Sequence, residues 1–430
     1  MSAGSESRIT RRGLLGSAAA AAGALTLGHR LPARAWGAGS PTPPFEHVVL
    51  VMMENRSFDH FLGWMPGGRQ AGLTYRDKAG LAHSTYPLAP DYQGCGHPDP
   101  DHSYEGGRVE YDDGRCDGWL RAGSNDEYAI GYYTRPDLAF LGQAVPQWTT
   151  FSRYFAAMLA ETYPNRIYQH AGQTDRIHNT TAISTLPTIW DRLAGAGLSG
   201  RYYYGDIPFL ALWGAKYLPI SRPYAAFEAD CAAGTLPNLA YVDPRFEDEQ
   251  SGTSGDDHPH ADIRNGEAFM ARVYRAVTSS PAWPKTVLIF NFDEWGGFFD
   301  HMPPPTAPIP AADAAAGNQD GRRGFRVPTL LVSPWARRGY VGSTLYDHTS
   351  VLRMIEDRWR LSPLTVRDAT ANSLAGTLTR TPNPRASQYT VPPGPFGGVC
   401  GGPTLPGAVS AEESEWTALR ALAAANGWPV

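Results

Sequence analysis

Three short apolar segments stand out in the hydrophobic pattern of the chain. Residues 45–53 (FEHVVLVMM), 285–292 (KTVLIFNF) and 326–332 (RVPTLLV) are of strand length and rich in apolar, β-branched side chains, which predicts strands buried on both faces of a sheet. Helical stretches lie between them, for example over residues 266–277 and 349–360. Because strands and helices alternate, we expect an α/β fold: a doubly wound, mainly parallel sheet with helices on both faces.

Irregular segments interrupt and follow these elements. Residues 66–144 are rich in Gly, Asp, Tyr and Pro with little periodicity, so we expect a loop-rich cap that covers one edge of the ligand site. Residues 302–323 form a second irregular loop. The principal domain is expected over residues 45–370, with a Pro/Gly-rich tail over residues 371–430 whose final helix, over residues 410–426, packs on the same domain.

The first 35 residues predict an export signal. Arg11 and Arg12 precede an apolar, small-residue run over residues 13–28, and residues 33–35 (ARA) have the pattern of a cleavage site. The paired arginines favour the twin-arginine route, while ordinary secretion stays open. The run is shorter than the roughly 20 residues of a membrane-spanning helix, which favours removal over an uncleaved anchor. We therefore expect the protein in the periplasm, in the cell wall or outside the cell.

The composition limits the classes of partner and indicates whether the cysteines form disulfides. With 42% hydrophobic and 18% charged residues and a formal net charge of -5, the 430-residue chain can bury a core and offers no basic stripe for nucleic acid. Cys95, Cys116, Cys231 and Cys400 lack metal-ligand spacing, so in an exported protein they predict disulfides with three possible pairings. We favour Cys95 with Cys116, because both lie in one Gly/Asp-rich loop.

Polar residues at the ends of the first two apolar segments are candidates for a metal site. Glu54 and Asn55 follow the first segment, and Asp293 and Glu294 follow the second. In doubly wound sheets ligands bind beyond the carboxyl ends of the strands, so we expect these oxygen ligands to converge on a hard cation. For either pair taken alone, a helix cap, a turn or a simple strand end is the alternative.

Thr162 is a candidate nucleophile because it lies just before a helix predicted to begin near Pro164. The unpaired N–H groups and partial positive charge of a helix N-terminus suit a phosphate, and a nearby metal would lower the pKa of the hydroxyl. An N-cap role for Thr162 is the alternative, and the two roles are compatible.

Histidines in polar stretches are candidates for proton transfer. His258 lies in residues 256–262 (DDHPHAD), where it could protonate a leaving alkoxide or bind phosphate oxygens. A solvated acidic loop is the alternative for this stretch. His102 and His348 lie in similar surroundings, and each taken alone is interpreted as structural.

Taken together, these segments resemble the non-specific phospholipase C and acid phosphatase family, a branch of the alkaline phosphatase superfamily. The resemblance spans residues 45–368. Its motifs are, in order, residues 54–60 (ENRSFDH) with Gly63, 96–103 (GHPDPDHS), 117–119 (DGW), 162–166 (TYPNR), 256–259 (DDHP) with Asp262, 293–301 (DEWGGFFDH), 327–329 (VPT), 333–335 (SPW) and 348–350 (HTS). The resemblance implies an alkaline phosphatase-like fold and an exported hydrolase of phosphate esters.

The resemblance also implies one divalent metal ion, with Ca, Mg, Mn, Zn and Fe all open. Its implied ligands are Glu54, Asn55, Thr162, Asp293 and Glu294. The implied catalytic residues are Thr162, as the nucleophile where some relatives have serine, and His258 and His102, facing the phosphate. Other matched motif residues, expected as possible contacts of phosphate or substrate, are Asn165, His301 and His348.

The implied activity is that of a phospholipase C, which converts phosphatidylcholine-type phosphodiesters to diacylglycerol and the phosphorylated headgroup through a phosphothreonine. An acid phosphatase on the same scaffold and a catalytically silent headgroup-binding protein are the alternatives. The partner is then a phospholipid or a small phosphate ester, with transient contact to a membrane surface. Trp295 departs from the family, where many relatives have a small polar residue or histidine, and it could either reshape the headgroup pocket or pack in the core.

Overall fold

An eight-stranded sheet lies at the centre of the computed structural model, which describes Met1 and residues 45–249, 251–400 and 411–430. The strand order is β13-β6-β12-β11-β1-β10-β8-β9. The strands are β1 (His47–Met53), β6 (Thr149–Phe151), β8 (Gly200–Tyr204), β9 (Ser221–Pro223), β10 (Leu239–Val242), β11 (Thr286–Phe292), β12 (Thr329–Val332) and β13 (Tyr340–Gly342). Apart from Met1, the predicted export signal lies outside the described residues.

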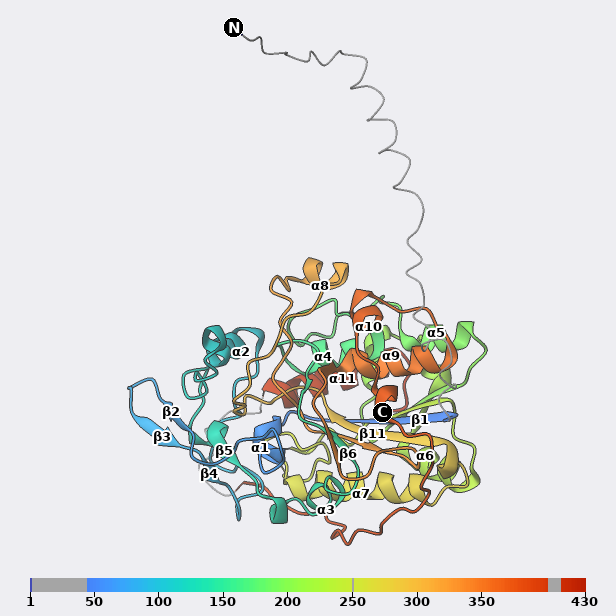
Figure 1. Cartoon of the computed structure of the whole chain (residues 1–430), viewed down its shortest axis with the longest axis horizontal. Helices are drawn as coiled ribbons and strands as arrows, with labels where there is room; N and C mark the ends of the chain where they lie inside the picture. The colour runs from blue at the N-terminus through green and yellow to red at the C-terminus, as the bar shows by residue number, and fades with distance from the viewer. Residues whose placement is uncertain (2–44, 250, 401–410) are drawn as a thin grey trace. The chain divides into compact units, whose positions relative to one another are not determined.

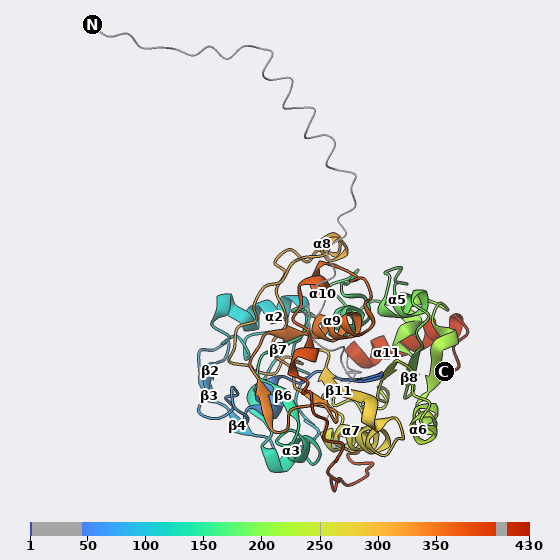
Figure 2. The ribbon, with the colours of Figure 1, turned by 45° about the vertical axis from the view of Figure 1, so that its right-hand side comes forward.

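Helices cover both faces of this sheet, which explains why its central strands are apolar throughout. Every residue of β11 is buried, and β1 is buried from its second residue onwards. Figures 1 and 2 show α9 (His348–Trp359) on one face of β11 and α7 (Ile263–Thr278) on the other. These helices match the two stretches predicted over residues 349–360 and 266–277. The predicted fold class, α/β with a mainly parallel sheet, is confirmed.

Most of the remaining helices and strands are shorter and lie in the connections. The other helices are α1 (Phe58–Leu62), α2 (Tyr104–Tyr111), α3 (Leu141–Ala144), α4 (Thr162–Ala171), α5 (Ile189–Gly195), α6 (Tyr224–Ala233), α8 (Ala311–Ala316), α10 (Val366–Thr370) and α11 (Ala411–Ala425). Three two-stranded pairs are formed by β2 (Thr74–Arg76) with β3 (Ala82–Ser84), β4 (Tyr86–Pro87) with β5 (Gly131–Tyr132), and β7 (Tyr154–Phe155) with β14 (Tyr346–Asp347). Among the described helices, none is long and apolar enough to cross a membrane.

The third predicted strand runs against the others. β12 pairs antiparallel with β11, with Leu288 opposite Val332 and Asn291 opposite Thr329. Ser333 therefore follows β12 at the far edge of the sheet, where its hydroxyl donates to the carbonyl of Thr286 at 2.8 Å. The local sequence predicted the strand but not its direction, because direction depends on the long connection after β11. The polar residues after β12 thus do not join those after β1 and β11.

Residues 66–144 carry short elements that pack on the principal domain. Trp119 and Ile130 are buried in one apolar cluster with Trp295 and Phe325. The rings of Trp119 and Phe325 have their centroids 4.6 Å apart. This segment is therefore anchored by its own apolar contacts, and its role as a cap stays a prediction.

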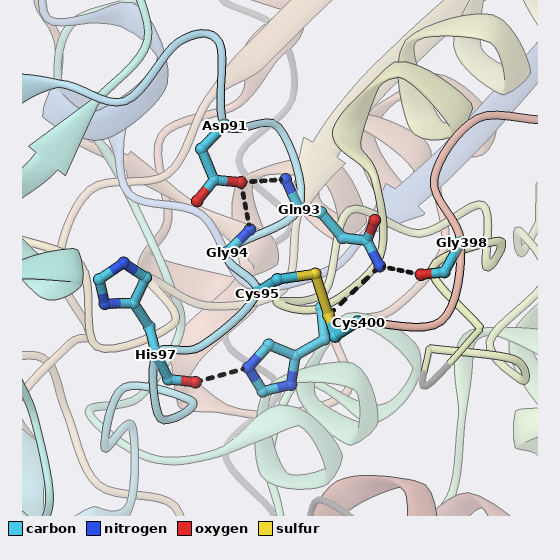
Figure 3. The surroundings of a disulfide bond; sticks show 8 residues. Asp91, Gln93, Gly94, Cys95, His97, Gly398 and Cys400 are labelled. Atoms are coloured by element: carbon cyan, nitrogen blue, oxygen red, sulfur yellow. Dashed lines mark hydrogen bonds between the residues drawn. A yellow bond between two sulfur atoms is a disulfide. The ribbon is translucent and has the colours of Figure 1, made fainter. Parts of the chain in front are cut away.

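The disulfide bond joins Cys95 to Cys400 across 305 positions, with a Cα–Cα distance of 5.3 Å (Figure 3). The preferred pairing of Cys95 with Cys116 is therefore wrong. Cys116 is buried in the apolar cluster of Trp119, and both it and Cys231 are free thiols. A hydrogen bond also holds the tail near Cys95: Nε2 of Gln93 donates to the carbonyl of Gly398 at 2.6 Å. Proximity in sequence was a poor guide here, since the tail folds back over the loop.

Candidate active site

Glu54 and Asp293 leave the sheet side by side. β1 and β11 are parallel neighbours, and their last residues, Met53 and Phe292, lie in register. The N–H of Asp293 donates to the carbonyl of Met53 at 3.1 Å, and the side chains of both acids are fully buried. The structure therefore brings together the two strand ends that the sequence predicted to meet.

Several donors fix the carboxylate of Asp293. Its Oδ1 accepts the backbone N–H of Asn55 at 3.1 Å and that of Glu294 at 2.7 Å, while Oδ2 accepts Nε of Arg166 at 2.9 Å. Nε2 of His348 donates to the backbone carbonyl of Asp293 at 2.6 Å. Burial lowers the pKa of His348 to about 4, so its ring is neutral near pH 7. His348 thus orients the end of β11 as a neutral hydrogen-bond donor.

The turn after Glu294 depends on glycine. Oε2 of Glu294 accepts the N–H of Gly296 at 2.6 Å, and both Gly296 and Gly297 have positive φ angles, of 65° and 67°. A Cβ on Gly296 would lie 2.0 Å from the carbonyl oxygen of Asn55. A side chain is therefore excluded where the two strand ends approach each other.

Asn55 offers a buried amide that the described part of the chain does not use. Its φ is 30°, its side chain is fully buried, and neither Oδ1 nor Nδ2 has a hydrogen-bond partner among the described residues. Leaving such a group unpaired costs about 1–3 kcal/mol. A buried amide oxygen on the residue between Glu54 and the hydrogen bond to Asp293 fits a divalent cation that prefers oxygen ligands. We call Glu54, Asn55, Thr162, Asp293 and Glu294 together the candidate metal site.

Thr162 is the first residue of α4, and it is fully buried. The helix begins two residues before the predicted start, with Glu161 rather than Thr162 at the N-cap position. Arg166 lies one turn further along the same face of α4 and contacts both Asp293 and Glu54, the latter through Nη2 and Oε2 at 3.7 Å. Thr162 therefore shares the helix face that is directed at the two strand ends.

Arg166 and Asp243 belong to this region although the sequence did not single them out. Nη1 of Arg166 lies 3.0 Å from Oδ1 of Asp243, which follows β10. β10 is the other parallel neighbour of β1, with Val242 opposite Val51. Burial raises the pKa of Asp243 to about 6, although Arg166 opposes this shift. The available signal was the short apolar run of β10 ending directly in an acid, the same pattern seen after β1 and β11.

A second group consists of Asp99, His102 and His258, here called the histidine group. Nδ1 of His102 donates to the carbonyl of Pro100 at 2.8 Å, and Nδ1 of His258 donates to that of Pro259 at 2.9 Å. Nε2 of His258 lies 3.6 Å from Oδ2 of Asp99, whose side chain is 21% exposed. One ligand atom from each of the three residues lies within 4.8 Å of the others, so this group too could hold a cation. Two oriented imidazoles beside a carboxylate also suit proton transfer.

Asp256 links the histidine group to the candidate metal site. Its backbone carbonyl accepts the N–H of Glu54 at 2.8 Å, and its Oδ1 accepts the N–H of His258 at 3.1 Å. The side chain is fully buried, and burial raises its pKa to about 6. The loop that carries His258 is therefore held against the end of β1, so the two groups are neighbours.

Asn165 and His301 lie in other local networks. The amide of Asn165 donates to the carbonyl of Ala160 at 2.7 Å and accepts the N–H of Met158 at 2.9 Å, which fastens the turn before α4. Nδ1 of His301 lies 2.5 Å from Oδ2 of Asp59. Asp59 and Asp300 also bind Arg326, at 2.9 Å each, which forms an ion-pair group apart from Asp293.

Trp295 packs in the core. It is fully buried, its Nε1 donates to Oε2 of Glu110 at 2.7 Å, and its ring lies 5.6 Å from that of Phe325. A Cβ on Gly107 would meet the indole at 2.9 Å. Of the two roles that the sequence left open, the structure favours packing.

The similarity to known proteins covers the part of the chain that forms the sheet and the candidate active site. The sequence model of the phosphoesterase family matches residues 45–362. The chain is 31% identical over 383 residues to non-specific phospholipase C6 of Arabidopsis thaliana, covering 80% of this chain and 74% of that protein. It is 31% identical over 473 residues to phospholipase C B of Mycobacterium tuberculosis, covering 90% and 87%. Among solved structures, a Vibrio parahaemolyticus protein in the alkaline phosphatase superfamily aligns with a TM-score of 0.39 at 9% identity, covering 77% and 70%.

Proposed function

The chain belongs to the phosphoesterase family, and on this premise we propose that it is a metal-dependent phospholipase C. Its substrates are phosphatidylcholine-type phosphodiesters, which it hydrolyses to diacylglycerol and the phosphorylated headgroup. The observation that carries the proposal is that Glu54 and Asp293 leave the sheet side by side, with both in contact with Arg166 of α4, the helix that begins at Thr162.

The cation is assigned to the candidate metal site, with the ligands Glu54, Asn55, Thr162, Asp293 and Glu294. The buried amide of Asn55 supports this assignment, because a bound ion would give its Oδ1 a partner. When bound, a divalent ion offsets charge on the nonbridging phosphate oxygens and lowers the pKa of the Thr162 hydroxyl. The oxygen-rich donor set fits a hard ion.

Thr162 is the nucleophile in this proposal. Its Oγ gives up its proton to solvent and bonds to phosphorus while the bond from phosphorus to the diacylglycerol oxygen breaks. His258, with His102 beside it, delivers a proton to the departing oxygen. Water then attacks the phosphothreonine and His258 takes a proton from that water. The bond between phosphorus and Oγ breaks, and Oγ regains a proton from solvent. Asp99, 3.6 Å from Nε2 of His258, stabilises the protonated ring.

We place the reaction outside the cytoplasm. The signal-like pattern over residues 1–35 supports export, and the disulfide between Cys95 and Cys400 is typical of proteins from oxidising compartments. A phospholipid substrate then requires transient contact with a membrane surface.

Paired assays test the proposal. A chromogenic choline phosphodiester and a simple phosphomonoester are compared, each with and without added metal. Phospholipase C activity predicts metal-dependent turnover that favours the diester. Preference for the monoester would instead indicate an acid phosphatase, and binding without turnover would indicate a silent headgroup-binding protein.

Two threonine variants test the nucleophile. Thr162→Ala should lower turnover by at least about 10³-fold, because the attacking oxygen is lost. Thr188→Ala is the matched control, because Thr188 is equally buried and precedes α5 as its N-cap. The control should lose stability and keep its activity. Undiminished hydrolysis by purified Thr162→Ala would exclude the nucleophile role.

A further inference from the structure

Arg166 reaches the ends of three parallel strands at once. Its Nε lies 2.9 Å from Oδ2 of Asp293 after β11, and its Nη1 lies 3.0 Å from Oδ1 of Asp243 after β10. Its Nη2 lies 3.7 Å from Oε2 of Glu54 after β1 and donates to the carbonyl of Met53 at 3.2 Å. All four charged side chains are fully buried. One guanidinium therefore fixes the relative positions of three carboxylates.

The balance of charge keeps Arg166 ionised. Arginine stays protonated in proteins, and the carboxylates of Asp293, Glu54 and Asp243 lie around its guanidinium. Three carboxylates brought together in a low-dielectric interior repel one another strongly. A single guanidinium offsets one of these charges and leaves the group negative overall, which is suited to a divalent ion.

The guanidinium of Arg166 packs on an aromatic ring. Its Cζ lies 4.6 Å from the ring centroid of Phe246. The ring of Phe246 stacks on Trp416 of α11 at 4.1 Å, with an angle of 8° between the planes. The ring of Phe246 and the three carboxylates together restrict the orientation of the Arg166 guanidinium. Because Arg166 and Thr162 lie one turn apart on α4, the same contacts set the start of that helix.

We propose that Arg166 is a positioning residue for the candidate metal site. It holds the carboxylates of Glu54 and Asp293 in the geometry that the cation needs and aligns the Thr162 end of α4 with them. This inference rests on the proposed function, because it presupposes a cation at that site. Arg166 is fully buried among the carboxylates, so it acts through them and makes no contact with substrate. Residues that orient metal ligands in this way typically contribute 10–100-fold to metal affinity.

Calorimetric titration of the metal-free full chain with Mn²⁺ tests the inference without any substrate. Arg166→Lys keeps the charge but loses the planar fork, so it should bind Mn²⁺ about 10–100-fold more weakly than wild type. Arg367→Lys is the matched control. Arg367 is also buried, donates to Asp347 at 3.0 Å and to the carbonyl of Ala157 at 2.8 Å, and lies 4.8 Å from the ring of Tyr168, and these partners are outside the candidate metal site. The control should lose stability and keep its Mn²⁺ affinity.

A second variant keeps the test decisive if Arg166→Lys fails to fold. Phe246→Leu leaves every charge in place and removes the ring below the guanidinium, so Mn²⁺ affinity should fall in the same direction. Unchanged Mn²⁺ affinity in a folded Arg166→Lys protein would overturn the inference. If Arg166→Lys does not fold, unchanged Mn²⁺ affinity in Phe246→Leu would overturn it. Equal losses in the Arg166 and Arg367 variants would also overturn it, because general loosening would then explain both. Failure of wild type to bind Mn²⁺ would instead remove the candidate metal site itself, so the two failures are distinguishable.

Discussion

The backbone N–H of Asn55 donates to Oδ1 of Asp293 at 3.1 Å, although 238 positions separate the two residues. The contact exists because β1 and β11 are parallel neighbours in register, so that their following residues leave the sheet at the same edge. The hydrogen bond uses the backbone of Asn55 and leaves its side-chain amide for another partner. The candidate metal site is therefore assembled by sheet geometry, and the side-chain amide of Asn55 has no hydrogen-bond partner among the described residues.

Replacement of Asn55 by glycine should weaken metal binding with little effect on the metal-free protein. The amide makes no hydrogen bond among the described residues, and a φ of 30° suits glycine, so little is lost without metal. A bound ion stabilises the folded state, and the free energy of stabilisation grows with the logarithm of its affinity. We expect the stabilisation by metal to fall by about 1.4 kcal/mol for each tenfold loss in affinity.

Melting curves with and without metal measure this effect. Asp113→Gly is the control, because Asp113 also has a positive φ, of 51°, and is not part of the candidate metal site. The control should show the same metal-induced shift as wild type. A full shift in Asn55→Gly would show that Asn55 is not a ligand.

Loss of the disulfide should destabilise the protein by about 2–5 kcal/mol, because the bond closes a very long loop in the unfolded chain. Cys95→Ser and Cys400→Ser should lose the same amount, and the double variant should lose no more than either. Denaturant unfolding with and without a reductant measures this. Reductant should lower the stability of wild type and leave the Cys95→Ser variant unchanged. A further loss in that variant under reductant would assign the effect to another thiol.

Glu267 should make stability fall as the pH rises from about 4 to about 7. Burial raises the pKa of Glu267 to about 7, against about 4.3 in an unfolded chain. The folded state therefore binds the proton more tightly, so the contribution is complete below pH 4 and declines through pH 7. Glu267→Gln does not titrate, and its Oε1 can still accept from Leu141, whose N–H lies 2.9 Å from Oε2 in wild type.

The difference in unfolding free energy, variant minus wild type, should rise by on the order of 2–3 kcal/mol between pH 4.5 and pH 7.5. Denaturant unfolding at several pH values measures it. A difference that stays constant with pH would contradict the assignment of this titration to Glu267.

Trp295→Phe should change stability and leave substrate preference unchanged. The indole N–H donates to the fully buried carboxyl of Glu110, whose pKa is raised by burial. Loss of this donor leaves a buried polar group unpaired, which costs about 1–3 kcal/mol. The ratio of diester to monoester turnover should match wild type. A shifted ratio at unchanged stability would place Trp295 in the headgroup pocket instead.

The sequence predicted the parts of this architecture that local patterns encode. The strands before Glu54 and Asp293 are continuous apolar runs, so their burial and parallel pairing follow from the pattern of strands and helices. Asp243 was missed, although the short apolar run of β10 ends directly in an acid as the runs of β1 and β11 do. The role of Arg166 could not be predicted, since its acceptors come from three different strands.

The direction of β12 and the partner of Cys95 depend on residues far apart in the chain, so no local pattern predicts them. The antiparallel direction of β12 depends on how the connection over residues 293–328 returns to the sheet. The partner of Cys95 depends on the path of the tail, which brings Gly398 to within hydrogen-bond distance of Gln93. Local sequence therefore predicted which residues end strands, and tertiary packing determined which of them meet.

The central claim is that Thr162 forms a covalent bond to phosphorus. The most direct test is rapid acid quenching of the metal-loaded enzyme during turnover of a choline phosphodiester, followed by mass spectrometry of its peptides. We expect a burst of released alcohol and a phosphocholine group on Thr162, absent from Thr162→Ala. Steady turnover with Thr162 unmodified, or with the group on another side chain, would exclude Thr162 as the nucleophile.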